Sequence, residues 1–448
     1  MRRTESSVDF NVRDYGARGE GATLDRDAIQ SAIDACNAAG GGAVRVPAGT
    51  YLTGSLQVKS GVCLHLEAGA RLLSNERPED FRELCKTPYG NLPGQIQALL
   101  WADKAENVSV TGQGIVDGAH PEALSSADAV GMTFRPALIF FRECRNVKFL
   151  DVTLQNSSLW TLHLQHCEDV LIHGVSIFNN PHRINSDGID PDGCRNVIIS
   201  DCNIRAGDDA ICIKSTEGRV CENITVTNCV LSTTCAALKI GTEALGDIRN
   251  ITFSNCVIYD TNVALALYMK DGSTYENMIF SNMVIESSNQ YPILVDVTPR
   301  YFKEPRKGKI RSIVFENVMV SSPGRCYVEG LPDRPIENLT FRNITWNVTG
   351  PLALENARKP AGARRTERDP AAPNYAVQPY QLVAAHVDDL EVSNFKVYDR
   401  RTPAAPDRGE FYLHGVHHAR LQRIARWASP AGVEPVRQDE CEDVKATE

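Results

Sequence analysis

The sequence has no long apolar run: nowhere do about 18 apolar residues follow one another, as a transmembrane helix requires. The opening stretch, MRRTESSVDFNV, holds two arginines but no run of apolar residues of the kind that forms the centre of a secretory signal. The chain also has fewer basic than acidic residues, with 47 Lys and Arg against 56 Asp and Glu, which gives a net charge of −9. Such a chain is a poor binder of polyanions. We therefore expect a cytoplasmic protein that binds neither a membrane nor nucleic acid.

The sequence does contain a repeat. Equivalent positions in successive copies lie 27 residues apart, and they are Asp169, Asn196, Asn223, Asn250 and Asn277. A fixed period of this size indicates a solenoid. Each copy holds short runs of β-branched residues, such as Asn-Val-Ile-Ile, and leaves no room for a helix. We predict an all-β right-handed parallel β-helix, since the LxxLxLxxN spacing of the alternative, a leucine-rich repeat, is absent.

We expect a single β-helix domain over residues 1–448. Residues 10–45 form an N-terminal cap and the first coil, and residues 46–400 form the following coils. A stretch rich in Ala, Arg and Pro at 351–380 breaks the pattern and is expected to be a loop insertion. Residues 401–448 form a last coil and a polar tail, which we expect to be disordered after Arg426.

A helix is predicted before the first coil. Ile29, Ile33 and Cys36 lie on one face of a helix, so the segment DRDAIQSAIDACNAAGGG is expected to cover the open end of the core. Thr23 or Asp25 is the expected N-cap, and the glycines at 40–42 end the helix.

Six of the 14 cysteines follow the same period as the coils. Two series with a spacing of 27 residues are Cys167, Cys194 and Cys221, and Cys202, Cys229 and Cys256. We interpret them as small apolar rungs inside the solenoid. Stacked thiols could form disulfides in an oxidising compartment, but a reduced state agrees with the expected cytoplasmic location.

Acidic side chains gather at the turns of two adjacent coils. The segments are NSDGI at 185–189 and GDDAI at 207–211. Aligning their isoleucines places Asp187 in the row of Asp209, with Asp208 next to both. Repulsion between such carboxylates favours a protonated form of one of them, as a general acid requires. We predict that these three aspartates are catalytic and that no metal or cofactor is needed, with a calcium site or an exposed acidic turn as the alternatives.

The same alignment predicts which side chains surround the acidic cluster. Alternate residues of a strand face opposite sides, so the outward residues form two rows. One row would hold His163, Asp190, Cys212, Lys239 and Ala266, and the next row Gln165, Asp192, Lys214, Gly241 and Tyr268. The residues that we expect to contact an oligosaccharide substrate are His163, Asn185, Asp190, Lys214, Lys239 and Tyr268.

These motifs resemble a known family. NSDGID at 185–190, AGDDAICIKS at 206–215 and the 27-residue coils are similar to glycoside hydrolase family 28, the polygalacturonase-like pectin hydrolases, over residues 10–343. The resemblance implies hydrolysis with inversion, in which Asp208 protonates the leaving oxygen while Asp187 and Asp209 activate water. An inverting site holds that water between carboxyl groups about 6.5–9.5 Å apart.

Two motifs of that family are missing. Its Gly-His-Gly is replaced by Cys-Ala-Ala at 235–237, and its Arg-x-Lys pair, which grips the substrate carboxylate, is replaced by Ala-Leu-Ala-Leu-Tyr at 264–268. The acidic residues are therefore present without the usual uronate-binding pair. This permits a different sugar at the cleavage site.

Three functions remain open. The first is an inverting, exo-acting hydrolase of pectin-derived or related plant oligosaccharides, with cleft walls supplied by insertions at 78–97, 119–135 and 351–379. The second is a β-helix polysaccharide lyase or isomerase, in which the acids would bind calcium and Lys239 would act as the base. The third is a non-catalytic carbohydrate-binding β-helix. The oligomeric state is open.

Overall fold

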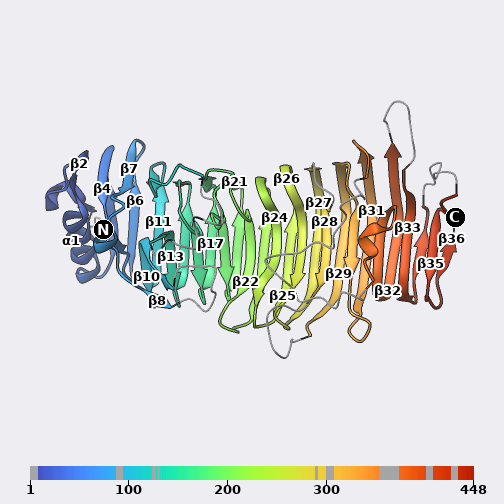
Figure 1. Ribbon diagram of the computed structural model, residues 1–448. Coiled ribbons are helices and arrows are strands. Elements are labelled where there is room, and N and C mark those ends of the chain that lie inside the picture. Colours follow the sequence, from blue (N-terminus) through green and yellow to red (C-terminus); the bar gives the residue numbers. More distant parts are fainter. Residues whose placement is uncertain are drawn as a thin grey trace, which may run out of the picture. The chain divides into compact units, whose positions relative to one another are not determined.

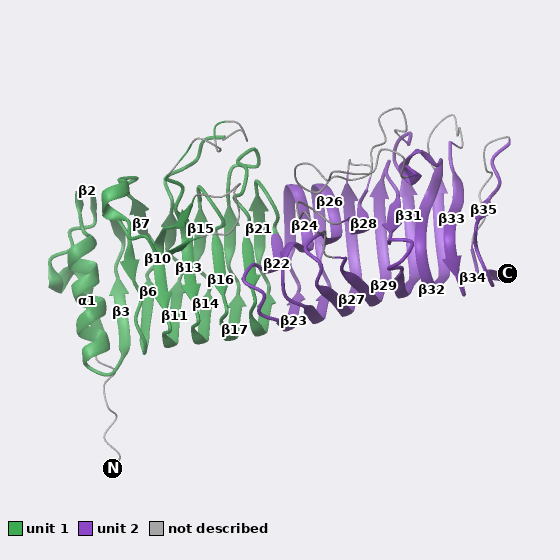
Figure 2. Ribbon diagram, turned by 60° about the horizontal axis from the view of Figure 1, so that its bottom comes forward, with its two compact units in different colours: residues 1–210 green, residues 211–448 purple. Residues whose placement is uncertain are grey.

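The computed structural model describes residues 9–86, 94–123, 128, 132, 134–287, 291–298, 307–352, 373–399, 407–424 and 432–447. The chain divides into two compact units, Met1–Ala210 and Ile211–Glu448 (Figure 2). Strands dominate both units, and within each unit almost all of the pairings are parallel (Figure 1). The predicted all-β parallel β-helix is confirmed, whereas the single-domain organisation stays a prediction.

The first unit contains one α-helix, α1 (Arg26–Ala38), and two 3₁₀ helices, η1 (Val12–Tyr15) and η2 (Pro78–Asp80), among its described residues. Its strands are β1 (Asp9–Asn11), β2 (Glu20–Leu24), β3 (Gly42–Val46), β4 (Gly49–Thr53), β5 (Leu56–Gln57), β6 (Val62–Leu66), β7 (Ala70–Ser74), β8 (Cys85–Lys86), β9 (Gln95–Ile96), β10 (Ala98–Asp103), β11 (Glu106–Gly112), β12 (Ile115–Asp117), β13 (Ala137–Arg142), β14 (Arg145–Leu150), β15 (Thr153–Gln155), β16 (Leu162–Gln165), β17 (Glu168–His173), β18 (Ser176–Phe178), β19 (Ile189–Asp192), β20 (Arg195–Ser200) and β21 (Asn203–Ala206).

The second unit contains the 3₁₀ helix η3 (Tyr375–Val377). Its strands are β22 (Ile211–Ser215), β23 (Cys221–Thr227), β24 (Val230–Ala244), β25 (Ile248–Ser254), β26 (Val257–Met269), β27 (Thr274–Ser287), β28 (Ile293–Val297), β29 (Lys309–Ser322), β30 (Cys326–Glu329), β31 (Ile336–Val348), β32 (Tyr380–Asp399), β33 (Gly409–His417), β34 (Arg420–Gln422), β35 (Val436–Asp439) and β36 (Lys445–Thr447).

Helix α1 covers the start of the first unit, as predicted. Its buried face consists of Ile29, Ala32, Ile33 and Cys36. The predicted cap differs in detail: Asp25 is the N-cap residue, but its side chain makes no capping hydrogen bond. Instead, its carboxylate accepts the N–H groups of Arg18 at 2.7 Å and Gly19 at 3.0 Å, so that it ties down the preceding loop. The glycines after the helix have positive φ angles, which suits the predicted end of the helix.

Each coil turns at a residue in the left-handed conformation. Asp169, Asn196 and Asn250 have φ angles of 57°, 55° and 58°, a region that Asn and Asp tolerate better than most residues. Their side chains also bond from coil to coil. The Nδ2 of Asn196 donates to Asp169 at 3.0 Å, and that of Asn250 donates to Asn223 at 3.1 Å. The repeated Asn thus supplies both the turn and a bond to its neighbour.

The interior of each coil is apolar and stacked. Phe253, Phe280, Phe315 and Phe341 form one such stack, with neighbouring ring centroids 4.9, 4.9 and 5.1 Å apart. These distances match the spacing of paired strands, about 4.8 Å. All fourteen cysteines are free thiols, and ten of them are buried. The cysteines are thus placed as small apolar groups, whereas the reduced state and the cytoplasmic location stay predictions.

The C-terminal region differs from the expected tail. Strand β35 pairs with β33, and β36 pairs with β34, so that residues after Arg426 add strands to the second unit. The expectation of a disordered tail is therefore wrong for residues 432–447. Most of the predicted insertion, residues 353–372, lies outside the described residues, and its end carries η3. In the described part of the chain, no helix has the length and apolar character needed to cross a membrane.

Candidate active site

The three predicted catalytic aspartates lie at neighbouring turns of the first unit. Asp187 lies two residues before β19, and Asp208 and Asp209 follow β21. The N–H of Gly188 donates to the carbonyl oxygen of Asp209 at 2.8 Å, and the next N–H along the chain donates to the carbonyl of Ala210 at 3.0 Å. The two turns therefore run side by side with Asp187 and Asp209 in adjacent positions, as the alignment of the isoleucines predicts.

The aspartates differ in exposure. Asp187 is 2% exposed and Asp209 is 1% exposed, whereas Asp208 is half-buried. One oxygen of Asp208, Oδ2, accepts the backbone N–H of Asn185 at 2.8 Å. Asp208 is thus the most open of the three carboxyl groups, and it is oriented by the turn that contains Asp187.

Two glycines allow the turns to approach each other. A Cβ atom on Gly207 would lie 2.3 Å from the carbonyl oxygens of both Asn180 and Arg183, closer than such contacts occur. A Cβ on Gly188 would lie 2.4 Å from the carbonyl oxygen of Ala210. Any side chain at these positions would force the turns apart, so each motif needs glycine next to its aspartate.

Arg135, which the sequence patterns do not single out, joins this site. Its guanidinium is 1% exposed and donates to the Ser158 carbonyl at 3.1 Å, the Ile184 carbonyl at 2.9 Å and the Asn185 side-chain oxygen at 3.3 Å. Burial, with the charge of neighbouring Arg183 adding to it, lowers the pKa of Arg135 to about 10. The carboxylates of Asp187 and Asp208 act in the opposite direction, because they favour the charged guanidinium. Arg135 therefore brings a buried positive charge close to two of the aspartates.

Two other predicted residues are enclosed beside this site. His163 and Asp190 pair across β16 and β19, in the predicted row. The Nε2 atom of His163 lies 3.1 Å from a carboxylate oxygen of Asp192, and its ring packs against Phe140 and Trp160 with centroids 4.9 and 4.8 Å away. His163 is 2% exposed and Asp190 is fully buried. The predicted roles of both residues in substrate binding stay predictions.

The predicted lysines lie in the second unit. Lys239 aligns with Cys212 and Ala266, as predicted for the first outward row. The register between β22 and β24 shifts between Ile213, which pairs with Ile240, and Ser215, which pairs with Ala244, so the predicted pairing of Lys214 with Gly241 stays a prediction. Strand β24 has extra residues at this point, and a regular 27-residue spacing does not predict such an irregularity.

Two ammonium groups flank the ring of Tyr268. The Nζ of Lys239 lies 5.5 Å from the ring centroid and that of Lys270 lies 5.6 Å from it, within the range of a cation–π interaction. Lys270 also forms a buried ion pair with Asp296. Lys214 forms a second one with Glu243, with 3.2 Å between Nζ and Oε2. Asp296 and Glu243 lack the motif context that would have marked them in the sequence.

Comparisons with known proteins agree with the resemblance. The model of the family described as glycosyl hydrolases family 28 matches residues 36–360. A probable polygalacturonase from Vitis vinifera is 32% identical over 212 residues, which cover 45% of this chain and 43% of that protein. An exo-poly-α-D-galacturonosidase from Dickeya chrysanthemi is 27% identical over 250 residues, which cover 45% of this chain and 41% of that protein. The matches thus span less than half the length of these relatives.

Solved structures share the fold. A hyperthermoactive exopolygalacturonase from Thermotoga maritima superposes with a TM-score of 0.67 at 26% identity, over 77% of this chain and 88% of that one. A family 28 exopolygalacturonase from Yersinia enterocolitica superposes with a TM-score of 0.73 at 20% identity, over 98% and 78% of the two chains. Because the family model covers more than half of the sequence and the β-helix agrees with it, this chain belongs to glycosyl hydrolases family 28.

Proposed function

We propose that this chain is an inverting glycoside hydrolase that removes sugar residues from the ends of pectin-derived or related plant oligosaccharides. One observation carries the proposal: three aspartates lie at two touching turns, and a buried arginine bonds to one of these turns beside Asp187 and Asp208. A binding module gains nothing from carboxylates that repel one another. The names of the relatives, which include exo-acting polygalacturonases, support the substrate class and the exo mode.

The proposed reaction is a single displacement. Asp208 donates its proton to the glycosidic oxygen as the bond between that oxygen and the anomeric carbon breaks. A water molecule attacks the anomeric carbon from the opposite face, and its proton passes to Asp187 or Asp209. The exposure of Asp208 fits a group that meets the substrate, and the enclosed positions of the other two fit groups that hold a water molecule. The product then has the inverted anomeric configuration.

Arg135 supports the role of Asp187 as a base. Its buried positive charge favours the ionised carboxylate of Asp187. The same charge acts on Asp208, so the proton of the proposed acid has to be held there by repulsion between the carboxylates. The guanidinium also fixes Asn185, whose N–H orients Asp208. The charge thus acts on the site without contacting the sugar, and we assign Arg135 as a positioning residue.

The second unit contains side chains that suit the binding of an acidic sugar. Lys239 and Lys270 place two ammonium groups around Tyr268, and the aromatic ring offers an apolar face of the kind on which sugars stack. We propose that this group binds a uronate carboxylate in place of the missing Arg-x-Lys pair, with Lys214 as a further contact. Asn185, in the first unit, stays a predicted substrate contact.

The test is a screen of galacturonan and rhamnogalacturonan oligosaccharides, with the anomer of the first-formed product followed by NMR. We expect hydrolysis with inversion and the release of small products from the start of the reaction. Asp208→Asn should lower kcat by at least about 100-fold, the usual scale for a general acid. An unsaturated product that absorbs in the ultraviolet would instead establish a lyase, and full turnover by Asp208→Asn would remove the assigned acid.

A further inference from the structure

A cavity near the C-terminal end of the second unit has no role in the proposed reaction. Its volume is about 620 Å³, which lies within the range of small-molecule sites. Tyr412 and His414 on β33 line it, together with residues at the end of β35. The end of the predicted insertion at 351–380 contributes Tyr375 and Gln378. The insertion thus forms part of a cavity of the size of a ligand.

This cavity is separate from the side chains around Tyr268 that are proposed to bind a uronate. The row that starts at Tyr268 continues through Asp296, Glu329, Ala385 and His414, with one residue on each strand. Paired strands lie about 4.8 Å apart, so four steps place His414 about 19 Å from Tyr268. Asp296 and Glu329 are buried between them. A ligand in the cavity therefore binds without touching the proposed uronate site.

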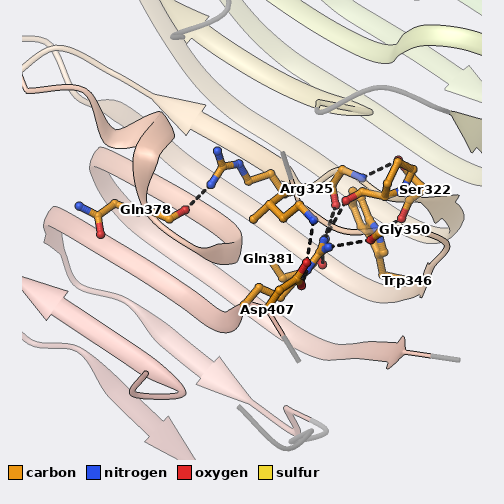
Figure 3. Close-up of polar contacts among 11 residues, drawn as sticks. Ser322, Arg325, Trp346, Gly350, Gln378, Gln381 and Asp407 are labelled. Carbon is orange, nitrogen blue, oxygen red and sulfur yellow. Dashed lines mark hydrogen bonds and ion pairs between the residues drawn. The ribbon is translucent and has the colours of Figure 1, made fainter. Parts of the chain in front are cut away.

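The part of the cavity that η3 forms is fixed to the rest of the unit. Arg325, whose guanidinium is fully buried, donates to the carbonyl oxygen of Gln378 (Figure 3). The hydroxyl of Tyr375 lies 3.2 Å from Nε2 of His386. The ring centroids of Tyr375 and His414 are 4.7 Å apart. The cavity is therefore already formed without a ligand, as is usual for sites that bind small molecules.

Carboxylate oxygens line the cavity beside its aromatic rings. Asp439 accepts a hydrogen bond from the hydroxyl of Tyr412 at 2.9 Å, and its other neighbour is Arg437, with 3.1 Å between Nη2 and Oδ2. A carboxylate oxygen of Glu440 lies 3.6 Å from Nε2 of His414, and 79% of the Glu440 side chain is exposed. Among the described residues that line the cavity, only His414 can carry a positive charge. The cavity thus offers acceptors for hydroxyl groups and repels a further carboxylate.

One polar atom of this lining lacks a partner. Nδ1 of His414 is buried and forms no hydrogen bond with the described residues. Buried polar atoms in proteins are nearly always paired, because leaving one unpaired is costly. A hydroxyl group both donates and accepts, so it can pair with Nδ1 in either protonation state of the imidazole. This atom therefore favours a ligand that carries hydroxyl groups.

We propose that this cavity is a second saccharide site, which binds a neutral sugar residue and takes no part in bond cleavage. The hydroxyl groups of a sugar match the carboxylate and amide oxygens, and its C–H groups pack against aromatic rings. The charge of Glu440 disfavours a uronate. A cationic ligand is less suited, because Arg437 already balances the charge of Asp439. The inference goes beyond the proposed function, since binding at this site requires no hydrolysis.

The test compares galactose with galacturonate, which differ only at C6, by isothermal titration calorimetry on the full chain. We expect galactose to bind with a millimolar dissociation constant. His414→Phe keeps a ring but removes both nitrogen atoms, and it should weaken the binding of galactose about tenfold. Glu440→Lys places a positive charge at an exposed position and should shift the preference toward galacturonate by about tenfold. This second variant serves if His414→Phe does not fold.

Glu442→Lys is the matched control. Glu442 is exposed two positions after Glu440 and does not line the cavity, so the same change of charge should leave the preference for galactose in place. The site is refuted if galactose does not bind, if neither His414→Phe nor Glu440→Lys alters its binding, or if Glu442→Lys acts as strongly as Glu440→Lys. Binding of spermidine without galactose would overturn the assignment of a neutral sugar. None of these outcomes bears on hydrolysis, so the proposed function is judged by its own assay.

Discussion

Replacing Arg135 with methionine removes both its hydrogen bonds and its buried positive charge, and each loss changes the stability of the protein. Three hydrogen bonds from a charged donor are lost, each of which contributes about 1.5–3 kcal/mol. The cost of burying the guanidinium is lost as well: the lowering of its pKa to about 10 corresponds to ~3 kcal/mol. The difference leaves a net loss of about 3 kcal/mol in the free energy of unfolding, measurable by urea denaturation.

Arg135→Met should also shift the pH profile of kcat/KM in a defined direction. Without the positive charge, the nearby carboxyl groups keep their protons to higher pH, so both limbs of the pH profile of kcat/KM should move upward. An opposite charge in contact shifts a carboxyl pKa by about 1–3 units. Because the guanidinium hydrogen-bonds to Asn185 rather than to a carboxylate, we expect the lower end, about one pH unit. Arg135→Lys keeps the charge and should preserve the position of the profile while it lowers kcat.

Arg183→Met is the control for this experiment. Arg183 is also buried, but its charge is balanced by Glu76 and Glu122, and it donates to a backbone carbonyl at 2.8 Å. Its loss should destabilise the protein and leave the pH profile in place. A profile that stays unshifted in Arg135→Met, with activity reduced only in proportion to the folded fraction, would refute the electrostatic role and leave Arg135 as a structural residue.

Three further outcomes are expected. Burial, with the charges of Arg183 and Arg135 adding to it, lowers the pKa of His120 to about 4, so below pH 6.5 the unfolded chain binds a proton that the folded chain does not. The free energy of unfolding should therefore fall by up to about 3 kcal/mol as the pH drops from 6.5 to 4. His120→Gln should make this fall smaller, as measured by urea denaturation at each pH. Gly207→Ala should displace the turn of Asp208 and lower kcat by about 100-fold, whereas Gly94→Ala, where a Cβ meets no atom, should leave kcat unchanged. Lys239→Met should raise KM for acidic oligosaccharides about tenfold, ~1.4 kcal/mol, and equal effects on neutral ones would argue against a uronate contact.

The sequence predicts the fold well because the signal is local and repeated. A left-handed turn at Asn196, a short β-branched run after it and an apolar rung such as Phe253 all recur at one spacing. The position of the aspartates follows from the same regularity, since adjacent coils place Asp187 and Asp209 side by side.

The features that the sequence does not predict depend on contacts between distant residues. Arg135 acts on partners 23 to 50 residues away, and nothing near it in the sequence marks that role. Asp25 has the residue type and position of a helix cap, but two loop N–H groups compete successfully for its carboxylate. The shift after Ile213 likewise arises where a strand lengthens locally, which a fixed period does not represent.

The asparagine bonds between coils continue across steps of very different length. Asn282 bonds to Asn255 over 27 residues, Asn317 bonds to Asn282 over 35, and Asn394 bonds to Asn343 over 51. The turn that each asparagine forms thus keeps its bond to the neighbouring coil whatever the number of residues between them. A solenoid with this property can gain or lose long loops at its rim without any repacking inside. New substrate preferences can therefore arise in such a chain by changes in loop length alone.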